Sequence, residues 1–262
     1  MRNNRIIPVV NGDNFRDLGG YQTQDGHTIK WHKVFRAGHL ANLNMSDQQK
    51  LIEAGVTVDI DLRSTAELAQ FPDCLPNGVK FKHLPILDDD ETESIQATEK
   101  LRRQYATDQM GGYRQMLTAY QRLADQKQVQ QAYHCFFKYL LRYGENAGIL
   151  FHCSAGKDRT GFLTVLLLSL LGVQPRQILA DYLLTNRVSQ RRIATRVYDA
   201  QKAEVSDAFV QSVRDLSVVQ DSYLYQALYK IKVEYGGMQN YLNEVVGITI
   251  AEMTRLKEIY LN

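Results

Sequence analysis

The stretch His152–Gly161, HCSAGKDRTG, places a cysteine, a lysine, an aspartate and an arginine within ten residues. The apolar segment GILF (148–151) precedes it, and the apolar segment FLTVLLLSLLGV (162–173) follows it. Charged groups at the boundary of buried elements cost free energy unless something there requires them. We therefore predict a buried strand, a functional loop and a central buried helix, which together form the βα unit of an α/β fold.

A loop between a strand and a helix N-terminus is suited to binding anions, because free N–H groups and the helix dipole both favour negative charge. Cys153 lies at the base of this loop, where the helix N-terminus and nearby cations favour the nucleophilic thiolate. Arg159 offers a planar fork that matches two phosphate oxygens. We expect Cys153 to attack phosphorus while the loop binds the phosphoryl oxygens. The expected phosphate-binding residues are Ser154, Ala155, Gly156, Lys157, Asp158 and Arg159.

The residues that flank the nucleophile suggest supporting roles. Thr160 is placed to donate its hydroxyl to the thiolate, and His152 to orient the cysteine backbone or hold the thiolate. A buried cysteine is usually an inert small hydrophobic residue, and a bare C-x5-R pattern is common by chance. The longer pattern H-C-x-x-G-x-x-R-T-G, set between an apolar strand and an apolar helix, favours the catalytic interpretation.

The motif is similar to the phosphate-binding loop of cysteine-dependent phosphatases, and its GKDRTG form resembles the atypical bacterial tyrosine and lipid phosphatase family. Further segments resemble landmarks of that family in the same order: NFRDLGGY (14–21), VFRAGHL (34–40), DLRSTAE (61–67), ADYLLTN (180–186) and YGGMQNYL (235–242). The resemblance implies a protein-tyrosine-phosphatase-like fold and hydrolysis of phosphate monoesters through a cysteinyl-phosphate intermediate, without metal or other cofactor. Family members act on phosphotyrosine, and several also act on phosphoserine, phosphothreonine or phosphoinositides.

The leaving group needs a general acid, which is commonly a carboxylic acid. Asp88, in HLPILDDD, matches the family pattern of an apolar strand with proline followed by aspartate. Asp158 is the second candidate, either as acid or base or as a residue that positions Arg159 and the attacking water. We expect Lys157 to add positive charge at the mouth of the site, and in the family a lysine here accompanies broad specificity that includes lipid head groups. Ser154 stands where eukaryotic inositol-lipid phosphatases have a lysine, which weakens the lipid interpretation.

Polar residues outside the loop suggest structural support for the site. Asp61 and Arg63 come at the end of a predicted strand, the end where α/β proteins place their sites. We expect them either to support the active site or to form a plain structural ion pair. A turn at NFRD is expected to bond loop backbone through Asn14, Arg16 and Asp17. Four arginines at helical spacing are favoured as a solvated face over a site for acidic substrates or anionic lipid: Arg187, Arg191, Arg192 and Arg196.

The local patterns also predict several helices and one insertion. A capped helix is expected to begin at Ser46 and end at Gly55. The polar segment 89–131, with two glycines at 111 and 112, is interpreted as surface helices joined by a hinge, forming either a lid over the site or an ordinary solvated insertion. An amphipathic helix follows over 129–144, and the C-terminal half is expected to be helical. Two later helices are expected to start at Pro175 and, with a capping box, at Thr249.

Composition sets limits on the class of protein. The 262 residues are 44% hydrophobic and 23% charged, as expected for a single globular domain spanning residues 1–262. A net charge of +2 gives no argument for nucleic-acid binding. Three cysteines without C-x-x-C spacing suit a reducing compartment, and the N-terminal apolar run is too short for a signal-peptide core. We therefore expect a cytoplasmic protein, with non-classical secretion and the oligomeric state left open.

Taken together, these features predict a single-domain α/β cysteine phosphatase with a central sheet flanked by helices. Its expected substrate is a phosphotyrosine protein, with possible broader specificity, and the alternative is a phosphoinositide, which alone would require contact with a membrane surface. A phosphate-binding module without catalysis is a remote alternative, because both Cys153 and Arg159 are present. A rhodanese-like sulfurtransferase or an arsenate reductase is less favoured, because neither Cys74 nor Cys135 is placed near the loop in sequence as a resolving thiol.

Overall fold

Strand β5 (Gly148–His152) is the central strand of the sheet that the described residues form. The computed structural model describes residues 4–87, 105–203 and 205–262. The strand order is β1-β2-β5-β3-β4. The outer strands are β1 (Arg16–Asp17), β2 (Val34–Ala37), β3 (Val56–Asp61) and β4 (Lys80–His83). Strands β2, β5, β3 and β4 run parallel, whereas β1 is antiparallel to β2.

The parallel arrangement brings the carboxyl ends of three strands to one edge of the sheet. His152 at the end of β5 is paired with Ala37 of β2 on one side and with Asp61 of β3 on the other. The three strands therefore end next to one another, and the loop after β5 begins between the ends of β2 and β3. This edge is where open α/β sheets bind their ligands.

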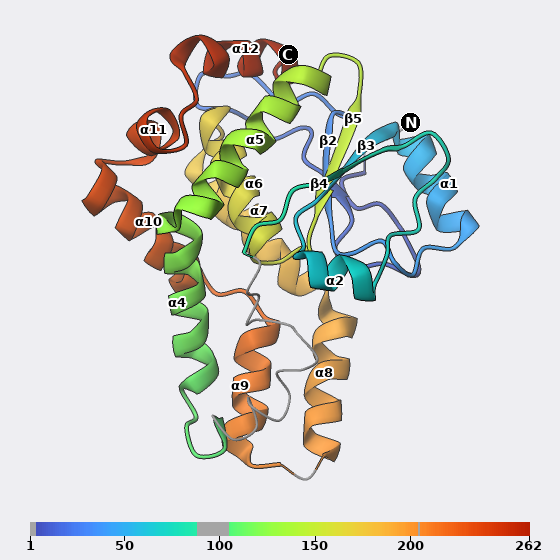
Figure 1. Ribbon diagram of the computed structural model, residues 1–262, viewed down its shortest axis with the longest axis vertical. Coiled ribbons are helices and arrows are strands. Elements are labelled where there is room, and N and C mark those ends of the chain that lie inside the picture. Colours follow the sequence, from blue (N-terminus) through green and yellow to red (C-terminus); the bar gives the residue numbers. More distant parts are fainter. Residues whose placement is uncertain (1–3, 88–104, 204) are drawn as a thin grey trace.

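Helices surround the sheet, so the predicted α/β class is confirmed (Figure 1). Those before β5 are α1 (Met45–Ala54), α2 (Thr65–Gln70), α4 (Gly111–Asp125) and α5 (Lys127–Tyr143). Those after it are α6 (Arg159–Leu170), α7 (Pro175–Val188), α8 (Gln190–Lys202), α9 (Asp207–Ser217), α10 (Asp221–Tyr235), α11 (Met238–Asn240), a π-helical turn (Tyr241–Val245) and α12 (Ile250–Tyr260).

The two faces of the sheet bury separate apolar clusters. Ile149 and Phe151 of β5 join the larger cluster, in which α5 and α6 pack, whereas Leu150 between them joins a smaller cluster with Leu51 of α1. Figure 1 shows α1 on one side of the sheet and α5 and α6 on the other. Nearly every side chain of α6 is buried, as its all-round hydrophobicity predicts. The helix that follows the loop is therefore fixed deep in the core.

Most predicted helix ends are confirmed. Pro175 is the first residue of α7, Gly144 follows the last residue of α5, and Thr249 caps α12 in a capping box with Glu252. The predicted start of α1 was wrong by two residues: the N-cap is Asn44, whose side chain accepts from the Asp47 N–H, and not Ser46. Both asparagine and serine are good N-caps, so the sequence pattern does not separate them.

The described part of the predicted insertion is packed in the protein and does not form a surface hinge. Gly111 and Gly112 begin α4 and are buried. The Gly112 N–H donates to the Ser212 hydroxyl of α9 at 3.1 Å. Tyr120 and Met116, further along α4, have no exposed surface. Residues 89–104 of this segment lie outside the described residues, and among those that are described no helix is long and apolar enough to cross a membrane.

We predict that Gly112→Ala destabilises the protein by roughly 1–3 kcal/mol, because an added methyl group must push α4 and α9 apart. A Cβ atom at this position would lie 2.5 Å from the Ser212 carbonyl oxygen. Urea denaturation measures the free energy of unfolding. Thr118→Ala on the exposed side of α4 is the control, with an expected change within about 0.5 kcal/mol. Equal effects of the two substitutions would contradict this packing role.

Candidate active site

The loop of residues 153–158 joins β5 to α6 and surrounds the position expected for a phosphoryl group. Cys153 directly follows β5 and is buried, with 3% of its surface exposed. Gly156 has a φ of +64°, and a Cβ atom there would lie only 2.3 Å from the Ala37 carbonyl oxygen. The left-handed backbone and the close approach to β2 both require glycine at this position.

Flanking segments bind the loop through its carbonyl groups. Asn14 Nδ2 donates to the Ala155 oxygen at 3.2 Å and to the Gly156 oxygen at 2.7 Å. Arg36 Nη2 donates to the same Gly156 oxygen, also at 2.7 Å. Among the described residues, the backbone N–H groups of 154–157 donate to no protein acceptor. The loop thus uses its carbonyls for its own support and keeps a run of N–H groups available for an anion.

A buried carboxylate holds the arginine that supports the loop. Asp181 of α7 accepts from Arg36 Nη1 at 2.7 Å, from Arg16 Nε at 2.9 Å and from the Tyr21 hydroxyl at 2.8 Å. Burial alone would raise the pKa of Asp181, but the two arginines hold it far below its usual value. Burial and the neighbouring Arg16 lower the pKa of Arg36 to about 10, so its guanidinium stays charged at neutral pH. The predicted bonding of loop backbone by the NFRD turn is confirmed for Asn14 and for Asp17, which accepts from the Gly19 and His32 N–H groups, whereas Arg16 mainly binds the Asp181 carboxylate.

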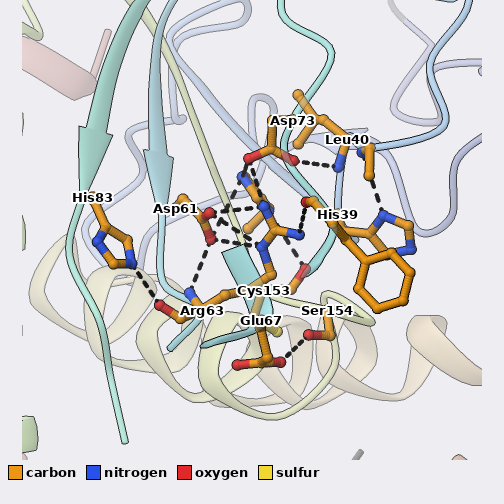
Figure 2. A network of polar contacts seen from close by, with 12 residues as sticks. His39, Leu40, Asp61, Arg63, Glu67, Asp73, His83, Cys153 and Ser154 are labelled. Carbon is orange, nitrogen blue, oxygen red and sulfur yellow. Dashed lines mark hydrogen bonds and ion pairs between the residues drawn. The ribbon is translucent and has the colours of Figure 1, made fainter. Parts of the chain in front are cut away.

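Glu67 orients Arg159, and it is a site residue that the sequence interpretation missed. Arg159 Nη1 donates to Glu67 Oε2 at 2.7 Å, and Nη2 donates to Oε1 at 2.8 Å. Ser154 also donates its hydroxyl to Glu67 (Figure 2). Burial opposes ionisation, yet the bonds to Arg159 and Ser154 lower the pKa of Glu67 to about 2. The sequence signal was present as the capping box of α2, in which Glu67 also accepts from the Ser64 N–H at 2.8 Å.

Lys157 and Asp158 contact the helical part of the protein. Lys157 is only 1% exposed, so it does not lie at the open mouth of the site as expected. Its Nζ donates to carbonyls at the end of α9, those of Leu216 and Val218, and lies 3.3 Å from Asp158 Oδ2. The other carboxylate oxygen of Asp158 accepts from the Tyr120 hydroxyl at 3.0 Å. The positive charge of Lys157 thus acts on Asp158 from inside the protein.

His152 lies within a cluster of buried carboxylates beneath the nucleophile. Its Nε2 is 3.2 Å from Asp73 Oδ2 and 3.5 Å from Asp59 Oδ1, and its Nδ1 is 3.4 Å from the Cys153 carbonyl oxygen. Burial alone would lower the pKa of His152, but Asp59, Asp61 and Asp73 raise it well above the usual value. A positively charged imidazole therefore precedes the cysteine directly.

Asp61 and Arg63, the predicted supporting pair, form an ion pair that extends to the segment after α2. Arg63 Nε donates to Asp61 Oδ1 at 2.9 Å, and Nη2 donates to Asp61 Oδ2 and to Asp73 Oδ2, both at 2.8 Å (Figure 2). Asp73 also accepts from the Leu40 N–H at 2.9 Å, and Arg63 donates to the Phe71 carbonyl at 2.8 Å. This network fixes the chain on both sides of α2. Helix α2 carries Glu67, which binds Arg159.

Among the described residues, three side chains of this cluster have the spacing of metal ligands. Ligand atoms of Asp59, Asp73 and His152 lie within 4.8 Å of one another. However, Asp73 Oδ2 already accepts from the positively charged Arg63. A second cation at that oxygen would be repelled by the guanidinium and by the imidazolium. We therefore assign the cluster as an ion-pair network.

The remaining predicted residues are placed as follows. The Thr160 hydroxyl is buried and has no hydrogen-bond partner among the described residues, so the expected donation to Cys153 is not formed. Asp88 lies outside the described residues. Cys74 and Cys135 are free thiols, the first donating to the Ala41 carbonyl and the second exposed on α5.

We predict that Glu67→Gln lowers kcat/KM by roughly 10- to 100-fold, because Arg159 loses the charged partner that orients its fork toward substrate. Hydrolysis of p-nitrophenyl phosphate measures the change. Glu53→Gln, an exposed position on α1, is the matched control and is expected to retain wild-type activity. Full activity of Glu67→Gln would contradict the positioning role.

We predict that Asp181→Asn lowers the free energy of unfolding by roughly 3–5 kcal/mol near neutral pH, because Arg16 and Arg36 then stay buried without a counter-ion. The difference from wild type should shrink below about pH 4, where the unfolded carboxylate takes up protons. Denaturant titrations across pH measure both effects, with Asp199→Asn on the exposed side of α8 as control. A small effect that does not change with pH would refute the account.

Comparison with known proteins agrees with this geometry. A family model described as "Tyrosine phosphatase family" matches residues 7–262. The triple specificity protein phosphatase PtpB of Mycobacterium tuberculosis is 28% identical over 280 residues, covering 95% of this chain and 96% of PtpB. A tyrosine-protein phosphatase of Nostoc commune is 29% identical over 233 residues, covering 85% of this chain and 72% of that protein. The resemblance inferred from the motifs is confirmed, and the chain belongs to the tyrosine phosphatase family.

Proposed function

We propose that this protein hydrolyses phosphotyrosine in proteins, with a specificity that extends to other phosphate monoesters. The observation that carries the proposal is the position of Cys153 at the base of a loop whose N–H groups are available, next to an arginine that Glu67 holds. This combination supplies a nucleophile, donors for the phosphoryl oxygens and a fixed guanidinium. A phosphate-binding module without catalysis would not need the thiol.

In the first step, the Cys153 thiolate attacks phosphorus, and the bond from phosphorus to the leaving oxygen breaks. The loop N–H groups and Arg159 stabilise the negative charge on the equatorial oxygens. The leaving oxygen takes a proton from a general acid, for which we retain Asp88 on the basis of its sequence pattern. In the second step, water attacks phosphorus, the sulfur–phosphorus bond breaks, and the thiolate and inorganic phosphate are released. We assign to Asp158, next to Arg159, the role of assisting the water.

Broad specificity is supported by the relative that is named as a triple specificity phosphatase and that matches nearly the whole chain. Phosphoinositides are the alternative substrate, and contact with a membrane surface follows only if they are used. Cytoplasmic location stays a prediction from the sequence.

Phosphate release from a phosphotyrosine peptide, a phosphoserine peptide and a phosphoinositide panel tests the proposal, with EDTA present throughout. We expect the wild type to release phosphate most rapidly from the phosphotyrosine peptide, and Cys153→Ser to be slower by roughly 10⁴-fold or more. A preference for phosphoinositides would favour the alternative substrate. Equal activity of the serine variant, or a requirement for metal, would refute the thiolate mechanism.

The general acid is tested by comparing leaving groups. We predict that Asp88→Asn slows hydrolysis of phosphoserine peptide by roughly 10²- to 10⁴-fold, because the alkoxide must be protonated as it leaves. Hydrolysis of p-nitrophenyl phosphate, whose leaving group is a weak base, should change much less. If Asp158→Asn shows this dependence on the leaving group and Asp88→Asn does not, Asp158 is the acid.

A further inference from the structure

A chain of two tyrosine hydroxyls ends on the Asp158 carboxylate. The Tyr182 hydroxyl of α7 donates to the Tyr120 hydroxyl of α4 at 2.7 Å, and the Tyr120 hydroxyl donates to Asp158 Oδ1 at 3.0 Å. Both tyrosines have no exposed surface, and Asp158 is 7% exposed. From this geometry we propose that Tyr120 is a positioning residue that holds Asp158 as a carboxylate for hydrolysis of the cysteinyl-phosphate, a role that rests on the function proposed above.

The direction of the chain follows from the chemistry of its members. Burial raises the pKa of both Tyr120 and Tyr182 well above the usual value for tyrosine, so both hydroxyls keep their protons. Each phenol has one proton to donate. Tyr182 donates its proton to the Tyr120 oxygen, and Tyr120 donates its own proton to Asp158. The chain must therefore end on an acceptor, and an ionised carboxylate is the strongest acceptor available there.

Both carboxylate oxygens of Asp158 face a donor or a positive charge. Oδ1 accepts from Tyr120, and Oδ2 lies 3.3 Å from the buried Lys157 ammonium. Each contact stabilises the ionised form in surroundings of low polarity. The titratable groups around Asp158 come from the loop and from four helices: Lys157 in the loop, Arg159 on α6, Tyr120 on α4, Tyr182 on α7 and Tyr223 on α10.

The ring of Tyr120 is fixed by its neighbours, so its hydroxyl has a defined position. It packs edge-on against Phe162 of α6, with ring centroids 6.4 Å apart, and edge-on against Tyr182 at 6.1 Å. Tyr223 packs on it at 6.0 Å and donates its own hydroxyl to the Asp215 carbonyl. Tyr120 thus fixes Asp158, the residue directly before α6, relative to α4.

A carboxylate held in this way suits the second step of the reaction. It can take a proton from the attacking water while the sulfur–phosphorus bond breaks and the electron pair returns to Cys153. It is poorly suited to the first step, which needs a protonated acid. The contacts of Tyr120 and Lys157 therefore assign Asp158 to hydrolysis of the intermediate and leave protonation of the leaving group to another carboxyl group.

Stopped-flow hydrolysis of p-nitrophenyl phosphate by Tyr120→Phe separates the two steps. We expect the burst of p-nitrophenol to keep its rate within about 2-fold, and steady-state kcat to fall by roughly 10- to 150-fold, the loss expected for one hydrogen bond to a charged group. The acidic limb of the kcat profile should move to higher pH, because the carboxylate without its donor is protonated more readily. In an Asp158→Asn background, Tyr120→Phe should cause no further loss.

Tyr133→Phe is the matched control, because Tyr133 is an equally buried tyrosine whose hydroxyl donates to the Leu123 carbonyl at 3.0 Å. It should leave both phases and the pH profile unchanged. Tyr182→Phe provides a second variant in case Tyr120→Phe does not fold, and it should shift kcat in the same direction by roughly 2- to 5-fold.

The inference is overturned if Tyr120→Phe behaves like Tyr133→Phe, or if it slows the burst and the steady state equally in both backgrounds, as a purely structural role would. If only Tyr182→Phe folds, an unchanged kcat and pH profile for that variant overturns it. Absence of any phosphate release by wild type would instead overturn the proposed function, and this inference with it.

Discussion

The hydrogen bond from Arg36 to the Gly156 carbonyl is the interaction on which the phosphate-binding loop depends. A loop can direct its N–H groups toward an anion only if its carbonyls find donors on the other side. A fully buried guanidinium supplies that donor, and it is stable there because Asp181 binds it and Arg16 together. Glycine at position 156 is required by a second contact, since the Ala37 carbonyl of β2 leaves no space for a side chain.

The two halves of the protein hold adjacent residues of the site. Arg159 is held from the sheet side, by Glu67 on α2, whereas Asp158 is held from the helical side, by Tyr120 on α4. The parallel strands determine the first contact, because the segments after β3 and β5 start at the same edge of the sheet. The burial of α6 determines the second, because its first turn is fixed against α4 and α7. In the mechanism proposed above, substrate binding and hydrolysis of the intermediate are thus supported by different parts of the fold.

The sequence was sufficient for the local features around the proposed nucleophile. The apolar segments around 152–161 predicted β5 and α6, and the spacing of Cys153 and Arg159 predicted an anion site. Glu67 was missed because the capping box of α2 already explains it locally, and its bond to Arg159 depends on packing across ninety-two positions of sequence. Lys157 was expected at the mouth of the site, but its burial depends on the end of α9. Tyr120 lies in a segment whose polarity predicted either a lid or a solvated insertion, yet it is fully buried.

The central claim is that catalysis passes through a phosphoryl group on Cys153. The most direct measurement mixes the wild type with p-nitrophenyl phosphate, quenches the reaction with denaturant during the burst, and maps the modified peptide by mass spectrometry. The mechanism predicts one phosphoryl group on the peptide that contains Cys153, and none on that peptide in Cys153→Ser. Turnover without a phosphorylated peptide, or a phosphoryl group on a different residue, would contradict it.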